Sequence, residues 1–208
     1  MPIKKYVANA DNTITNAFQE NLSIRGTGSN MGRADILEVF SIYGQASTSS
    51  VELERVLVNF PVSTISADRS SGILPASGSV DFYVKLTNAP HAGTTPTDFE
   101  LVTSAVRRSW QEGTGLDMND YADLTYDGNG SNWINAASTS AGLVAWTTEG
   151  GDFYTEGYSS YTSSFDTGIE NIEVNITPLV ERWIAGTRTN YGLGIYLNAD
   201  YEGSSSSN

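Results

Sequence analysis

The stretch Val180-Glu-Arg-Trp-Ile-Ala-Gly-Thr-Arg-Thr-Asn-Tyr-Gly-Leu-Gly-Ile-Tyr-Leu197 decides the fold class that the sequence predicts. Thr177-Pro178, just before it, favours a helix start, because Thr can cap free N–H groups and Pro at the first helical position loses no hydrogen bond. One short helix near 178–185 is therefore expected to end at Gly186. A turn through 190–192 and an apolar strand follow it.

Alternating apolar and polar residues predict strands elsewhere in the chain. In 80–86 the residues Val80, Phe82, Val84 and Leu86 share one face, as in a sheet with one solvated side. Similar alternation, or a short apolar run, predicts further strands at 36–43, 51–60, 99–106, 172–176 and 193–197. With a single short helix, this pattern predicts an all-β protein built as an antiparallel β-sandwich.

The size of the chain favours one domain. Its 208 residues are 39% hydrophobic and 11% aromatic, which is enough for a core, and β-sandwiches commonly reach this length. We divide the chain into an N-terminal arm or edge strand (1–25), a single domain (26–201) and a flexible Ser-rich tail (202–208). The arm contains Tyr6, Ile14 and Phe18, and these are more apolar than a free tail requires, so we expect them to contact a partner.

The charge balance excludes several classes of partner. The chain has 24 acidic and 11 basic residues and a net charge of −13, which opposes binding to nucleic acid and to anionic membranes. No apolar run approaches the roughly 18 residues that span a bilayer. The start lacks the apolar segment of a secretory signal, which predicts synthesis and retention in the cytoplasm.

The sequence offers little catalytic chemistry. Its single histidine, His91, lies in a turn-like segment, and the chain has no cysteine. There is no G-x-S-x-G motif, and the glycines in 25–32 do not have the G-x-G-x-x-G spacing of a nucleotide loop. We therefore expect a protein that is not an enzyme, with no catalytic residues and no cofactor.

An acidic segment, 117–130, is the one weak metal candidate. Closely spaced carboxylates are ligands that calcium prefers. The residues from Asp123 to Gly128 resemble the start of an EF-hand loop, but the twelfth position is Ile134 where a Glu is needed. A solvated acidic turn and a calcium site of another type both stay open, and the candidate ligands are Asp117, Asp120, Asp123 and Asp127.

The aromatic residues divide into two groups. Phe60, Trp110 and Trp183 lie in apolar patterns, and we expect them to be structural anchors of the core. Trp133, Tyr154, Tyr158 and Tyr161 fall in the loop-rich region 111–170, where contact residues often occur. We interpret this second group as candidates for binding a partner.

Several short motifs come in an order that resembles a known family. They are Asn30-Met-Gly-Arg-Ala-Asp-Ile-Leu-Glu-Val39, Arg55-Val-Leu-Val-Asn-Phe60, Trp110-Gln-Glu-Gly113, Asn132-Trp133, Val180-Glu-Arg-Trp-Ile-Ala-Gly186 and Asn190-Tyr-Gly192. Together they resemble the DNRLRE-type domain, a jelly-roll module found on bacterial surface proteins and beside polysaccharide-degrading enzymes. The resemblance covers residues 28–197. It implies a jelly-roll type of sandwich in which these motifs are scaffold.

The opening residues 1–18, with 113–118 and 130–135, are similar to structural proteins of tailed phages from marine bacteria. This similarity implies a virion component, either a capsid decoration (cement) protein or a tail-associated protein, assembled in the host cytoplasm. Its partners would be other virion subunits, and it would be oligomeric. Relatives of this kind run on past the position of Asn208. The alternative function is a carbohydrate-binding module that recognises a glycan by aromatic stacking.

Overall fold

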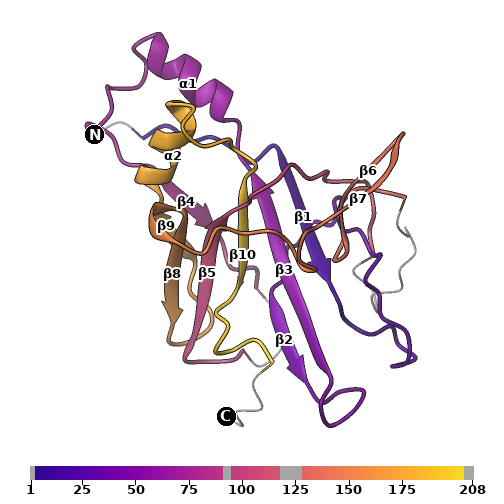
Figure 1. Ribbon diagram of the computed structural model, residues 1–208. Coiled ribbons are helices and arrows are strands. Elements are labelled where there is room, and N and C mark those ends of the chain that lie inside the picture. Colours follow the sequence, from indigo (N-terminus) through magenta and orange to yellow (C-terminus); the bar gives the residue numbers. More distant parts are fainter. Residues whose placement is uncertain (1–2, 91–94, 118–127, 204–208) are drawn as a thin grey trace.

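The computed structural model describes residues 3–90, 95–117 and 128–203, and it is mostly antiparallel β-sheet with short helices (Figure 1). In chain order its elements are β1 (Ala10–Thr15), β2 (Phe40–Tyr43), β3 (Val51–Asn59), α1 (Val62–Ser70), β4 (Tyr83–Leu86), β5 (Phe99–Ala105), β6 (Asn135–Thr139), β7 (Gly142–Ala145), the 3-10 turn η1 (Gly157–Ser159), β8 (Ser160–Phe165), β9 (Ile172–Asn175), α2 (Thr177–Ile184) and β10 (Leu193–Leu197). The prediction of an all-β protein with antiparallel sheets is confirmed.

A six-stranded main sheet organises the molecule. Its order is β1-β3-β10-β5-β8, and β2 also pairs with β3. Glu54 of β3 pairs with Thr15 of β1 and with Phe40 of β2, so β1 and β2 lie along opposite edges of β3. The pairs β4–β9 and β6–β7 form separate two-stranded sheets.

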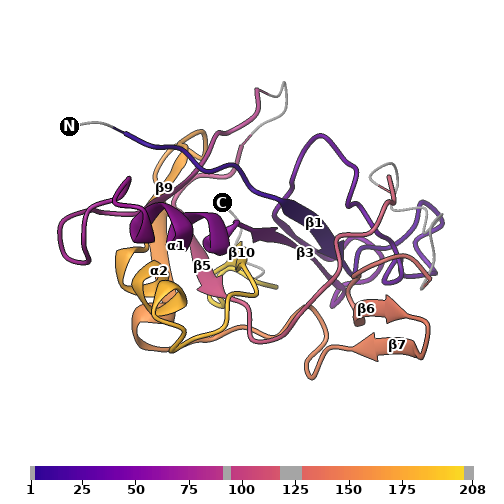
Figure 2. The same cartoon turned by 90° about the horizontal axis from the view of Figure 1, so that it is seen from above.

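Both faces of the main sheet are covered. Val56 and Val58 of β3 belong to the larger hydrophobic cluster, which we call the main core. Leu57 belongs to a smaller cluster, the second core, because alternate side chains of a strand point to opposite faces. Seen from above, the helices and β9 lie on one side of the sheet and the β6–β7 hairpin on the other (Figure 2).

The prediction of a single helix is wrong, because the described residues form two α-helices. α2 (Thr177–Ile184) agrees with the expected position and buries Leu179, Val180 and Trp183. α1 (Val62–Ser70) was not predicted, since it buries only Val62 and Ile65 and shows little helical periodicity. The two helices contact each other, and Arg69 Nη2 donates to Glu181 Oε1 at 2.8 Å.

Most predicted strands are present, with changes at their ends. The predictions at 51–60, 99–106, 172–176 and 193–197 correspond to β3, β5, β9 and β10. Those at 36–43 and 80–86 are confirmed only in their second halves, as β2 and β4, and Ile36 is exposed rather than buried. The strands β6, β7 and β8 were not predicted, because they are short or polar and lack a clear apolar alternation. β1 lies in the segment 1–25, which was predicted to be an arm or an edge strand.

A buried asparagine joins three segments that are distant in sequence. Asn30 Nδ2 donates to the carbonyls of Glu112 at 2.7 Å and Ser131 at 2.8 Å, and its Oδ1 accepts from Gly115 N at 2.8 Å. A Cβ at Gly32 would collide with the Glu112 carbonyl. The motifs that begin at Asn30 and Trp110 therefore lie against each other, and Gly permits the close approach of the two backbones.

Candidate functional site

Two of the predicted partner-binding residues are interior. Ile14 is 0% exposed and lies in the second core. Trp133 lies in the same core, where the Arg55 guanidinium stands 5.1 Å from its ring centroid. Neither side chain can reach a partner in this fold, because the polar segments around them pack on the sheet rather than extend from it.

The other predicted residues of the arm are tied to the domain. The Tyr6 hydroxyl donates to Asp68 Oδ2 at 2.6 Å, and burial, together with this hydrogen bond, raises the pKa of Tyr6 to about 12. The Phe18 ring lies 4.0 Å from the Arg25 guanidinium. Both rings are part-buried by contacts within the chain.

The N-terminal segment (residues 3–9) is held along the surface in an extended form. Lys4 forms an ion pair with Asp68, and Asn9 N donates to Asn59 O at 2.9 Å. Hydrogen bonds from Lys4 and Tyr6 lower the pKa of Asp68. While Tyr6 packs toward the main core, Ile3 and Val7 remain 87% and 81% exposed. An anchored segment thus presents apolar side chains to solvent.

The predicted tyrosines of 154–161 lie near arginines that were not among the predicted site residues. Two arginine guanidinium groups lie near the Tyr154 ring, Arg188 at 3.7 Å from its centroid and Arg107 at 5.2 Å. Arg182 lies 5.0 Å from the Tyr158 ring. We call these five residues the arginine–tyrosine surface. Tyr161 lies beside it, and its hydroxyl donates to Tyr158 O at 2.9 Å.

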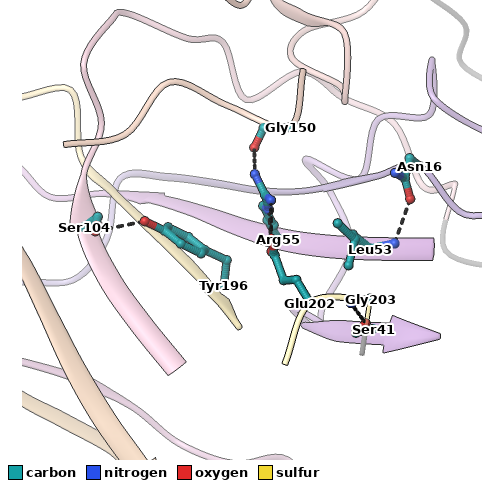
Figure 3. Close-up of polar contacts among 9 residues, drawn as sticks. All are labelled: Asn16, Ser41, Leu53, Arg55, Ser104, Gly150, Tyr196, Glu202 and Gly203. Carbon is teal, nitrogen blue, oxygen red and sulfur yellow. Dashed lines mark hydrogen bonds and ion pairs between the residues drawn. The ribbon is translucent and has the colours of Figure 1, made fainter. Parts of the chain in front are cut away.

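Arg55 lies on the face of the main sheet that carries the second core, and it holds several polar contacts there (Figure 3). Its guanidinium donates to both carboxylate oxygens of Glu202, at 2.9 and 2.6 Å, and to Gly150 O at 3.0 Å. Gly203 N donates to Ser41 Oγ at 2.9 Å. Glu202 and Gly203 are therefore held by the fold, although the predicted flexible tail begins at residue 202. Residues 204–208 lie outside the described chain.

The buried Glu54 of β3 lies beside a part-buried carboxyl, Glu38. Glu54 is buried, and neither of its oxygens receives a hydrogen bond from a donor. Burial raises the pKa of Glu54 to about 9, and the neighbouring Glu38 carboxyl adds to the shift. Glu54 is thus protonated at neutral pH and can itself donate to Glu38.

The calcium candidates are placed only in part. Asp117 is buried, and its Oδ2 accepts from Asn30 N at 3.2 Å. Asp120, Asp123, Asp127 and also His91 lie outside the described residues. Within residues 3–90, 95–117 and 128–203, no three acidic or histidine side chains gather in a way that could hold a metal ion.

The three expected anchors lie in or against the cores. Trp183 is buried in the main core, and Phe60 packs against it. Trp110 packs against the second core, and its indole Nε1 donates to Tyr191 O at 2.7 Å.

A shallow groove of about 460 Å³ runs between α1 and the 183–190 turn, and its lining includes Asn9, Asn59, Ser63 and Asn190.

No protein-family model, no curated protein and no solved structure matches this chain. In the part of the chain that the structure describes, no helix has the length and apolar character to cross a membrane.

Proposed function

We propose that this protein is a non-enzymatic structural component of a tailed-phage virion, a capsid decoration or tail-associated protein with a jelly-roll type of sandwich. It acts through contacts with other virion subunits. The sequence similarity described above motivates the virion assignment. The anchored N-terminal segment is the structural observation that supports a contact-making role.

The N-terminal segment has the properties of a docking element. It is ordered by Asp68 and Asn59 before any partner binds, so little conformational entropy is lost on association. Ile3 and Val7 are almost fully exposed, and burying an aliphatic side chain contributes about 1.5–3 kcal/mol. These two exposed side chains do not stabilise the monomer. When a neighbouring subunit covers them, their burial stabilises the complex.

The tryptophans give little support to the alternative function, a module that binds a glycan. Trp133, Trp146 and Trp183 are 5%, 6% and 6% exposed. Stacking on a sugar requires an open ring face, which these three side chains do not offer. Protein contact through the exposed aliphatic residues is therefore the function that we favour.

The composition of purified particles tests the assignment. Particles of the phage that encodes this chain should contain it in many copies when analysed by quantitative mass spectrometry. Ile3→Ser with Val7→Ser should reduce incorporation at least about fivefold, because two buried aliphatic side chains contribute a few kcal/mol. The variant should keep the wild-type Tm, since both residues are exposed.

Leu143→Ser is the matched control. Leu143 is an exposed aliphatic residue on β7, on the other side of the main sheet. Its replacement should leave incorporation unchanged. Particles without the chain would refute the virion assignment. Equal incorporation of the double variant would refute the docking role of the N-terminal segment.

A further inference from the structure

The arginine–tyrosine surface is a concentration of positive charge on an acidic protein. The chain has only 11 Lys and Arg against 24 Asp and Glu. Arg107, Arg182 and Arg188 nevertheless lie on the two rings of Tyr154 and Tyr158, at 3.7–5.2 Å from the ring centroids. Electrostatics within the chain would favour spreading these cations among the acidic side chains.

Local hydrogen bonds show that these residues form one surface. The N–H groups of Thr187 and Arg188 both donate to Arg182 O, at 3.1 and 3.3 Å, so the two arginines lie within one turn at the end of α2. Tyr154 N donates to Ala105 O at 2.9 Å, which brings Tyr154 beside Arg107. η1, which contains Tyr158, lies against α2.

The three arginines lack anionic partners in the described part of the chain. The ion pairs there involve other cations: Lys4, Arg55, Arg69, Lys85 and Arg108. In addition, Nη1 of Arg188 is buried and has no hydrogen-bond acceptor. A buried donor without an acceptor costs about 1–3 kcal/mol, more when it is charged.

A guanidinium beside an aromatic ring can still bind a carboxylate. The cation–π contact places the charge near the ring face and uses none of the N–H donors. Two of these N–H groups can donate parallel hydrogen bonds to one carboxylate, a geometry that favours Arg over Lys. The rings also restrict the long side chains, so binding loses less rotamer entropy.

We propose that the arginine–tyrosine surface binds the carboxylates of an acidic segment on a neighbouring protein subunit. The protein nature of the partner rests on the proposed function. A protein segment suits the surface better than a nucleic acid does, because a long polyanion would extend beyond these arginines onto a molecule of net charge −13. A short run of Asp and Glu confines its charge to the surface.

Binding of a labelled hexaglutamate peptide to the purified full chain tests the proposal by fluorescence anisotropy. Arg182→Ala with Arg188→Ala should weaken binding at least about tenfold, and raising NaCl from about 50 to about 500 mM should weaken it similarly. Arg182→Lys with Arg188→Lys keeps the charge but removes the paired donors, and we expect an intermediate affinity. Arg33→Ala, an exposed arginine elsewhere, is the matched control and should bind as wild type.

Several results would overturn the proposal. They are absence of binding by the wild type, equal binding by the double Ala variant, and tighter binding of an oligothymidylate than of hexaglutamate at this surface. Arg188 is part-buried, so the Tm of each variant is measured, and Arg182→Ala alone serves if the double variant unfolds. The assay uses a free peptide and no particles, so its failure is separate from absence of the chain in virions.

Discussion

Arg55 and Glu202 lie 147 positions apart in the chain and form a paired ion bridge, with Nε 2.9 Å from Oε1 and Nη2 2.6 Å from Oε2. Their side chains are only 14% and 16% exposed. Arg55 is on β3 of the main sheet, and Glu202 follows β10. The bridge therefore fixes the chain beyond the last strand to the centre of the sheet.

Glu202→Ala should lower the free energy of unfolding by about 1–3 kcal/mol, because it leaves the mostly buried Arg55 without its anionic partner. Urea unfolding monitored by tryptophan fluorescence measures the change. Glu149→Ala, at an exposed carboxylate, is the control and should have an effect within about 0.5 kcal/mol. Equal stability of the two variants would show that the bridge is only a surface contact.

Glu54 predicts a pH dependence of stability. Because burial raises its pKa from 4.5 to about 9, the folded protein binds this proton more tightly than the unfolded chain does. The stabilising contribution is complete below about pH 4.5 and is lost as pH rises through about 9. Glu54→Gln removes this titration, so its advantage in Tm over the wild type should grow between those pH values.

The control for this experiment is Glu20→Gln, at an exposed position. Its Tm should follow that of the wild type across the same pH range. A constant difference between Glu54→Gln and the wild type would mean that Glu54 is ionised in the folded protein. The measurement therefore tests the protonation state directly.

Local patterns explain which parts of the fold were predictable. α2 was predictable because Thr177-Pro178 marks its start and Trp183 lies on its apolar face. α1 was not, since its few buried residues give no periodic signal. The raised pKa of Glu54 could not be predicted from β3 alone, because the Glu38 carboxyl that adds to the shift comes from the β1–β2 connection.

The site residues were likewise predictable only where a local pattern marks them. Tyr154 and Tyr158 were identified because they are aromatic residues in a polar region. The arginines that lie near their rings come from the end of α2 and from the end of β5, and nothing in the local sequence links these places. Pairing of Arg55 with Glu202 likewise depends on tertiary structure alone.

We expect that position 194 requires glycine because of one neighbouring side chain, Phe153. A Cβ at position 194 would collide with the Phe153 ring, which also stacks on Tyr196 at 4.8 Å between centroids. Gly194→Ala should cost about 1–3 kcal/mol through overpacking. In a Phe153→Ala background the same substitution should cost almost nothing, because the collision is gone. Equal costs in both backgrounds, measured by urea unfolding, would place the constraint in the backbone of β10.

Truncation separates the N-terminal segment from β1. Deleting residues 2–8 removes the contacts of Lys4 and Tyr6 with Asp68 but leaves β1 paired with β3. We expect a folded protein with a modest loss of Tm and with poor incorporation into particles.

Deleting residues 2–15 also removes β1, including the fully buried Ile14, whose loss alone costs about 2–5 kcal/mol. The longer deletion should therefore give unfolded protein in circular dichroism and urea titration. If it folds, β1 is a dispensable edge strand and the second core closes without it. If the shorter deletion already unfolds the chain, residues 3–9 belong to the core of the domain and cannot be an arm for a partner.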